Sequence, residues 1–246
     1  MPRLLVVFVD ALGPEQLSRF GDGLSSLPER RSLRGIVGYS SGALATVLTG
    51  GAPRAHGRMC LFSRARAPSI LAPLAWLGLL PAIVHERAWL RRQLSRALAA
   101  VHGLEGYVAL HRVPPRAFAG LDLPERDDLF TTDAIGGRRT FLSRAREAGL
   151  DVAITPWQLP EEARWEHLDA LLERRRPSLT FAYAAALDGA LHEEGEDGPR
   201  ARAARARIAE GIARARDRLG DCVTLVVGDH GMAPVDRVVD PRPFVK

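Results

Sequence analysis

Short apolar runs alternate with longer amphipathic segments along the chain, and this alternation restricts the fold more than any other feature. The strand-like runs are residues 4–9, 33–37, 107–110, 152–155, 179–184 and 223–227. Apolar residues recur at helical spacing in residues 87–101, 139–148, 161–174 and 200–219. Such alternation is typical of βαβ units, and runs that are apolar throughout indicate strands buried on both faces. We therefore predict an α/β fold with a mostly parallel central sheet and helices on both faces.

One segment interrupts this pattern. Residues from about 58 to 133 are rich in Pro and Arg and contain few clear strands, so we expect a lid or inserted subdomain within one domain that spans residues 1–246. The apolar stretch at residues 67–84 contains three prolines and is shorter than the roughly 20 residues that a membrane span needs. We expect it to be buried or to form part of the lid.

Composition excludes some classes of function and setting. The formal charge of +5 comes from arginine, because Lys246 is the only lysine, and without a Gly-Lys-Ser/Thr motif a P-loop is excluded. Cys60 and Cys222 are too few for a disulfide framework, which favours a reducing, cytoplasmic location. The first apolar run is short and ends at Asp10, so it does not resemble a secretion leader.

Acidic residues follow three of the strand-like runs, namely Asp10, Asp188 and Asp229, and two histidines, His192 and His230, stand close behind them. In open α/β sheets, ligands gather at the carboxyl ends of the strands. Each residue alone would more often be a cap or a surface pair. Three acids and two histidines together favour a site for zinc or a similar divalent ion.

A fourth element, residues 38–57, places Ser40 and Ser41 just before a segment with helical character. The N-terminus of a helix favours an anion, although an isolated serine at such a boundary is more often only a cap.

Together these motifs resemble the alkaline phosphatase superfamily, most closely its nucleotide pyrophosphatase and type I phosphodiesterase branch. FVDALG resembles the first metal-binding strand segment, and SSGALATVLTGGAPRAHG resembles the nucleophile segment that ends in TG, Pro and HG. LDGALHEEG resembles the D-x-x-x-H-x-x-G metal segment, and VVGDHGM resembles the D-H-G-M segment. The resemblance runs from Asp10 to Met232 and is general in the middle third.

The resemblance implies two divalent metal ions, with zinc expected and manganese as an alternative. One metal would be held by Asp10, Asp229 and His230 together with the oxygen of Ser40. The second would be held by Asp188 and His192. Ser40 would be the nucleophile, because it lies ten residues before Gly50, as in the family, with the adjacent Ser41 as the alternative.

The resemblance also gives His56 a place in the HG motif, which we expect to be structural. The family usually adds a further histidine to the second metal site, beyond D-H-G-M, and no histidine follows His230. The explanations are a chain that lacks C-terminal strands, which we favour, another residue that completes the site, or a weak second metal. The other histidines, His85, His102, His111 and His167, are expected to be exposed rather than ligands.

The predicted function is a metal-dependent phosphodiesterase or nucleotide pyrophosphatase that acts on a small anionic phosphoester, with nucleotides among the candidates. A phosphomonoesterase or phosphomutase and a degenerate, non-catalytic member are the alternatives. Neither cysteine lies in the C-x-P-x-R context of sulfatases. A basic module that binds nucleic acid is the least favoured, because 29 acidic residues nearly balance 34 basic ones. No membrane partner is expected, and the oligomeric state is open.

Overall fold

The structure is a computed structural model that describes residues 2–36, 39–65, 69–81, 87–106, 108, 110–235, 237 and 239. The chain divides into two compact units, unit 1 with residues 1–35 and 150–246 and unit 2 with residues 36–149. The residues of the expected lid, 58–133, belong to unit 2.

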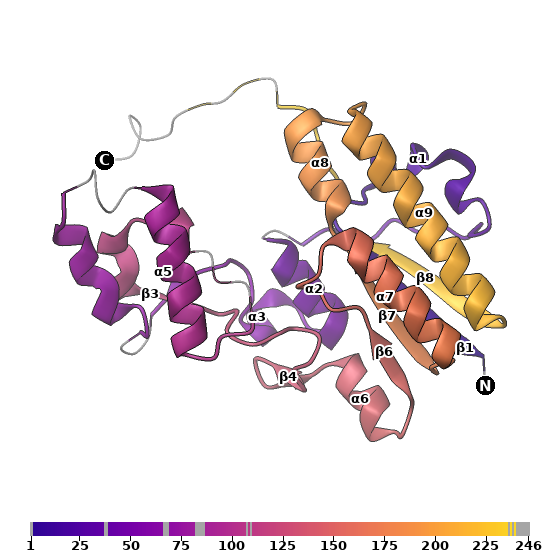
Figure 1. The fold of residues 1–246 in the computed structure, drawn as a ribbon, viewed down its shortest axis with the longest axis horizontal. Coiled ribbons are helices and arrows are strands. Elements are labelled where there is room, and N and C mark those ends of the chain that lie inside the picture. Colours follow the sequence, from indigo (N-terminus) through magenta and orange to yellow (C-terminus); the bar gives the residue numbers. More distant parts are fainter. Residues whose placement is uncertain are drawn as a thin grey trace. The chain divides into compact units, whose positions relative to one another are not determined.

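Unit 1 contains a four-stranded, fully parallel sheet in the order β6-β7-β1-β8 (Figure 1). Its strands are β1 (Arg3–Val9), β6 (Val152–Ile154), β7 (Leu179–Ala184) and β8 (Cys222–Gly228). The helices of unit 1 are α1 (Pro14–Ser18), η1 (Gly21–Leu24), α7 (Glu161–Arg174), α8 (Ala186–Glu194) and α9 (Pro199–Leu219). The predicted α/β class with a parallel sheet flanked by helices is confirmed.

The core of unit 1 lies between the sheet and helices α7 and α9, which run side by side in Figure 1. Alternate residues of β1, Leu5, Val7 and Val9, face this core. The core residues of α9 recur every three or four positions: Ala201, Ala204, Ile208, Ile212, Ala215 and Leu219. This spacing places one apolar stripe of the helix against the sheet. Hydrophobic burial therefore holds the strand ends in a fixed register.

Unit 2 is built from short elements. Its helices are α2 (Ser40–Thr49), α3 (Pro53–His56), η2 (Ala72–Leu79), α5 (Ala88–Val101), η3 (Leu110–Arg112), η4 (Pro115–Gly120) and α6 (Phe141–Glu147). Antiparallel pairs join β2 (Ser63–Arg64) to β3 (Leu121–Asp122) and β4 (Ala134–Ile135) to β5 (Arg138–Arg139). Leu71, Leu98, Leu110, Phe118 and Leu123 form a separate small core.

Two expected strands are absent from the described residues. Residues 33–36 have no regular structure and pair with no strand among the described residues, and Leu33 is 72% exposed; Val37 lies outside the described residues. Within 107–110, Leu110 begins the 3-10 helix η3, where its buried side chain joins the small core, and residues 107 and 109 lie outside the described part.

Candidate metal centre

The carboxyl ends of three neighbouring strands, β7, β1 and β8, meet at one edge of the sheet. Val9 at the end of β1 is paired with Ala184 of β7 and with Gly228 of β8. Asp10 follows β1 directly, and Asp229 follows β8. Asp188 comes shortly after the end of β7, in the first turn of α8, where the helix dipole favours its negative charge. The parallel register therefore brings three carboxylates from distant parts of the sequence to one place.

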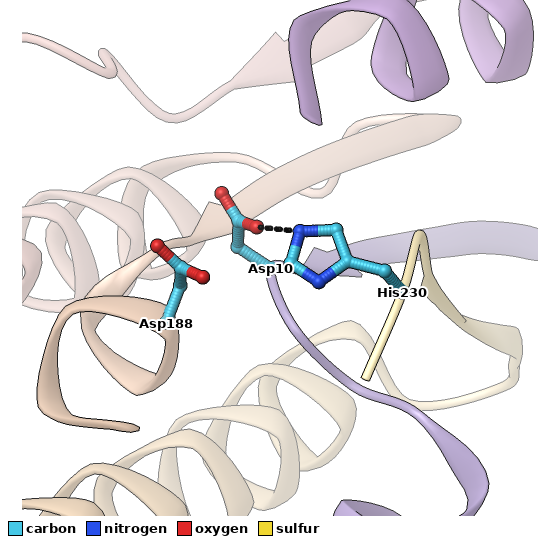
Figure 2. A group of neighbouring side chains, drawn as sticks. All are labelled: Asp10, Asp188 and His230. Carbon is cyan, nitrogen blue, oxygen red and sulfur yellow. Dashed lines mark ion pairs between the residues drawn. The ribbon is translucent and has the colours of Figure 1, made fainter. Parts of the chain in front are cut away.

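Figure 2 shows how Asp10, Asp188 and His230 point toward one another. One ligand atom from each residue lies within 4.8 Å of the ligand atoms of the other two. Nε2 of His230 is 3.5 Å from Oδ1 of Asp10, and Asp10 is only 5% exposed. Two carboxylates and an imidazole at this spacing form a donor set that suits zinc or another divalent ion.

Asp229 uses its two carboxylate oxygens differently. Oδ1 accepts hydrogen bonds from the backbone N–H of Ala11, at 3.0 Å, and of His230, at 2.9 Å. Oδ2 is buried 3.4 Å from Nε2 of His230 and has no hydrogen-bond partner among the described residues. Oδ1 of Asp188 is likewise buried without a hydrogen bond within the described part of the chain. Buried carboxylate oxygens normally have partners, and a cation would supply one for both.

The imidazole of His230 is held in one tautomer. Its Nδ1–H donates to the carbonyl oxygen of Gly231 at 3.0 Å, so the lone pair of the neutral ring is on Nε2, which faces Asp10 and Asp229. Burial alone would lower the pKa of His230, but the Gly231 bond and the carboxylates of Asp229, Asp10 and Asp188 outweigh it and raise this pKa. The ring is thus oriented as a metal ligand would be.

Sequence reasoning missed Tyr183, which lies on β7. Its hydroxyl donates a hydrogen bond to Oδ2 of Asp10 at 3.0 Å. Burial, reinforced by the charge of Asp10, raises the pKa of Tyr183 well above the usual value, so the hydroxyl keeps its proton. The available signal was a tyrosine in a strand, LTFAYA, in which Thr180 is the only other residue with a polar side chain.

The side chain of His192 is more exposed than that of His230, the other histidine of the predicted site. Its Nε2 lies 3.5 Å from Oδ1 of Asp188, one helical turn earlier on α8, and its side chain is 65% exposed. Its contact with Asp188 places it at the margin of the cluster.

The serine segment lies in unit 2. Ser40 is the first residue of α2, and Ser41 follows it. The hydroxyl of Ser41 hydrogen-bonds the carboxylate of Glu125, a contact that sequence reasoning did not anticipate. Burial raises the pKa of Glu125, while the Ser41 bond and the charge of Arg58 lower it in part. Glu125 and Arg58 are both buried, and the charge of each influences the pKa of the other.

His56 has a structural position. Its Nδ1 accepts the N–H of Arg58 at 3.2 Å, so Nε2 carries the proton and donates to Thr46 of α2 at 2.9 Å. Burial and the charges of Arg58 and Arg138 lower the pKa of His56. Gly50 and Gly57, the glycines of the TG and HG motifs, end α2 and α3 with φ of 66° and 73°, which glycine adopts without strain. This part of the motif thus fixes two turns.

Residues 4–246 match the family described as type I phosphodiesterase / nucleotide pyrophosphatase. The chain belongs to this family. This family is a branch of the alkaline phosphatase superfamily, and the parallel α/β sheet of that superfamily agrees with the sheet of unit 1. Members are metal-dependent hydrolases of phosphoesters, and the Asp10, Asp188 and His230 cluster is the corresponding candidate metal site here.

No curated protein matches the chain. Among the described residues, no helix is both long enough and apolar enough to cross a membrane.

Proposed function

We propose that the protein hydrolyses a phosphodiester or pyrophosphate bond of a small anionic substrate, such as a nucleotide, with two divalent metals and a serine nucleophile. The observation that carries this proposal is the convergence of Asp10, Asp188 and His230 at the carboxyl edge of the sheet. Family membership supports hydrolysis of a phosphoester, and the cluster supports its dependence on metal.

The donor set fits the proposed metals. Asp10, Asp229 and His230, with the oxygen of Ser40, would hold one ion, and Asp188 with His192 would hold the other. Two ions of this kind stabilise both the attacking and the leaving oxygen of an in-line phosphoryl displacement. We favour zinc because imidazole and carboxylate ligands suit it, with manganese as the alternative.

Ser40 is the proposed nucleophile. Its hydroxyl oxygen would attack phosphorus and expel the leaving alcohol or phosphate, and water would then release the group from the serine. Ser40 is the first residue of α2, and the N-terminus of a helix favours an anion such as a phosphate group. Ser41, whose hydroxyl hydrogen-bonds Glu125, is the alternative nucleophile.

The contacts of α9 argue against the alternative of a nucleic-acid-binding module. Three arginines of α9 are paired with acidic residues of α7: Arg207 with Glu162, Arg214 with Asp169 and Arg218 with Glu173. These pairs neutralise much of the charge that would attract a phosphate backbone.

Serine variants and two chromogenic substrates test the proposal. With zinc or manganese, the chain should hydrolyse bis-p-nitrophenyl phosphate, and Ser40→Ala should reduce kcat by about 1,000-fold or more, since loss of a nucleophile removes the covalent route. Ser41→Ala should keep most of the rate, and Ser63→Ala, at an exposed position of β2, is the control.

The outcomes separate the hypotheses. A normal rate in both Ser40→Ala and Ser41→Ala contradicts the serine mechanism. Preference for p-nitrophenyl phosphate over the diester changes the assignment to phosphomonoesterase. Metal binding without turnover of either substrate indicates a degenerate member of the family.

A further inference from the structure

We propose that Tyr183 is a positioning residue for the metal centre, because its hydroxyl holds Oδ2 of Asp10 and so turns Oδ1 toward His230. The hydrogen bond from Tyr183 is 3.0 Å long, and Oδ1 lies 3.5 Å from Nε2 of His230. This inference rests on the proposed function, since it assigns a role in preparing the same metal site.

The register of the sheet explains why Tyr183 reaches Asp10. Tyr183 is paired with Phe8 on β1, and Asp10 lies two residues beyond Phe8, on the same face of the strand. The backbone N–H of Asp10 also donates to the carbonyl oxygen of Ala184, at 2.9 Å, which continues the pairing to the end of both strands. Tyr183 therefore meets Asp10 through a rigid parallel ladder rather than through a loop.

Both the backbone and the ring of Tyr183 make contacts that hold it in place. Its backbone N–H donates to Oγ1 of Thr155 at 3.1 Å, and its carbonyl oxygen accepts from Nη1 of Arg164 at 2.8 Å. The guanidinium of Arg164 lies 5.3 Å from the ring centroid, and the ring of Phe8 lies 5.9 Å from it on the neighbouring strand. A hydrogen-bond donor held in this way restricts the rotation of the carboxylate that accepts its bond, because the carboxylate of an aspartate otherwise rotates over a broad range.

Packing alone does not require the hydroxyl. Phenylalanine would fill the same space against Phe8 and Arg164, whereas the phenol adds one directed donor to a carboxylate that we assign to the metal. Partners that orient the ligands of a metal typically contribute about 10–100-fold to its affinity. Removal of this hydroxyl is therefore expected to weaken metal binding without disturbing the core.

The experiment titrates the full chain, depleted of metal by a chelator, with zinc and separately with manganese, and follows the heat of binding. Tyr183→Phe should raise Kd by about 10–100-fold. Thr180→Val is the matched control, because it removes a buried hydroxyl from the same strand that has no hydrogen-bond partner among the described residues. Its Kd should equal that of the wild type.

Thermal unfolding adds a readout that a purely structural role would not produce. The metal-free Tm of Tyr183→Phe should stay near that of the wild type, while the rise in Tm on adding zinc should shrink. A lower metal-free Tm with an unchanged zinc-induced rise would assign Tyr183 to the core and overturn the inference.

Failure of this inference and failure of the proposed function are distinguishable. A wild-type Kd in Tyr183→Phe overturns the role of Tyr183 and leaves the metal centre in place. A wild-type chain that binds neither metal overturns the metal centre, and the role of Tyr183 with it.

Discussion

The backbone N–H of Ala11 donates to Oδ1 of Asp229 across 3.0 Å, joining the end of β1 to the end of β8. Among the described residues other than glycine, Ala11 alone has a positive φ, 60°, and it is fully buried. A left-handed backbone costs a non-glycine residue about 1–2 kcal/mol and persists only where the surroundings hold it. The bond to Asp229 is one such restraint, and it lies directly beside the candidate ligand Asp10.

Asp229→Asn should weaken binding of the metal that we assign to Asp10, Asp229 and His230, while preserving the fold. The amide oxygen of the variant side chain can still accept the N–H groups of Ala11 and His230, but its NH₂ group places donors where Oδ2 faces Nε2 of His230. We expect at least about a 100-fold loss of zinc affinity, because the change removes a charged ligand rather than its supporting partner. Metal content after dialysis against zinc measures this, with the exposed Asp197→Asn as control. Unchanged zinc content in Asp229→Asn would exclude it as a ligand.

Glu125→Gln should destabilise the protein. It removes the negative charge that faces Arg58, and both side chains are buried, with Glu125 only 4% exposed. Loss of a compensating partner costs a buried polar group about 1–3 kcal/mol, and more for a charged group such as the guanidinium of Arg58. Urea unfolding of this variant and of the exposed Glu105→Gln measures the difference. A change below about 1 kcal/mol, the value of a surface pair, would mean that Arg58 does not depend on Glu125.

His56 should make the stability depend on pH. Its pKa in the folded chain lies below the ordinary value of 6.5, so the unfolded chain takes up a proton first as the pH falls. His56 therefore makes its full contribution to the free energy of unfolding above pH 6.5. This contribution is lost as the pH falls from 6.5 to the lowered pKa of the folded chain.

The variant His56→Gln tests this dependence. It should be less stable than the wild type at pH 8, because it loses the contacts to Thr46 and Arg58, yet lose less stability on acidification. Unfolding free energies at a series of pH values decide this. If the unfolding free energies of the two proteins change with pH in parallel, His56 has the same pKa in the folded and unfolded chains, and the prediction is wrong.

Gly211→Ala should destabilise unit 1. A Cβ at this position of α9 would lie 2.5 Å from the ring of Trp165 on α7, so the two helices would have to separate. Overpacking of this kind costs about 1–3 kcal/mol. Gly189→Ala on α8 is the matched control, because a Cβ there meets nothing within 4 Å. It should be neutral or stabilising by up to about 1 kcal/mol, the helix preference of Ala over Gly. Equal Tm values for the two variants would contradict the tight α7–α9 contact.

Strong periodicity made part of the fold predictable. β7 and α7 were expected at the residues where they occur, because a continuous apolar run and a helical repeat each persist over their whole length. The run at residues 33–37 failed as a strand since five residues of β-like composition carry no information about a partner strand. Its described part, 33–36, lies outside any sheet.

The sequence predicted the candidate site only through the general rule that ligands gather at the carboxyl ends of parallel strands. Asp10 and Asp188 follow strands that the sequence reveals, and the parallel sheet brings them together with His230. The hydrogen bonds of Tyr183 and Glu125 depend on which strands and loops become neighbours in three dimensions, and no local pattern encodes that. Sequence spacing alone also gives no measure of the exposure of His192.

The most direct test of a metal-dependent diesterase is the rate of bis-p-nitrophenyl phosphate hydrolysis as zinc is returned to the metal-depleted wild-type chain. The rate should be negligible without metal, rise with added zinc until the site is filled, and fall again with a chelator. Manganese should substitute at least in part. A rate that is the same with chelator as with saturating zinc would contradict a role for metal at the Asp10, Asp188 and His230 cluster.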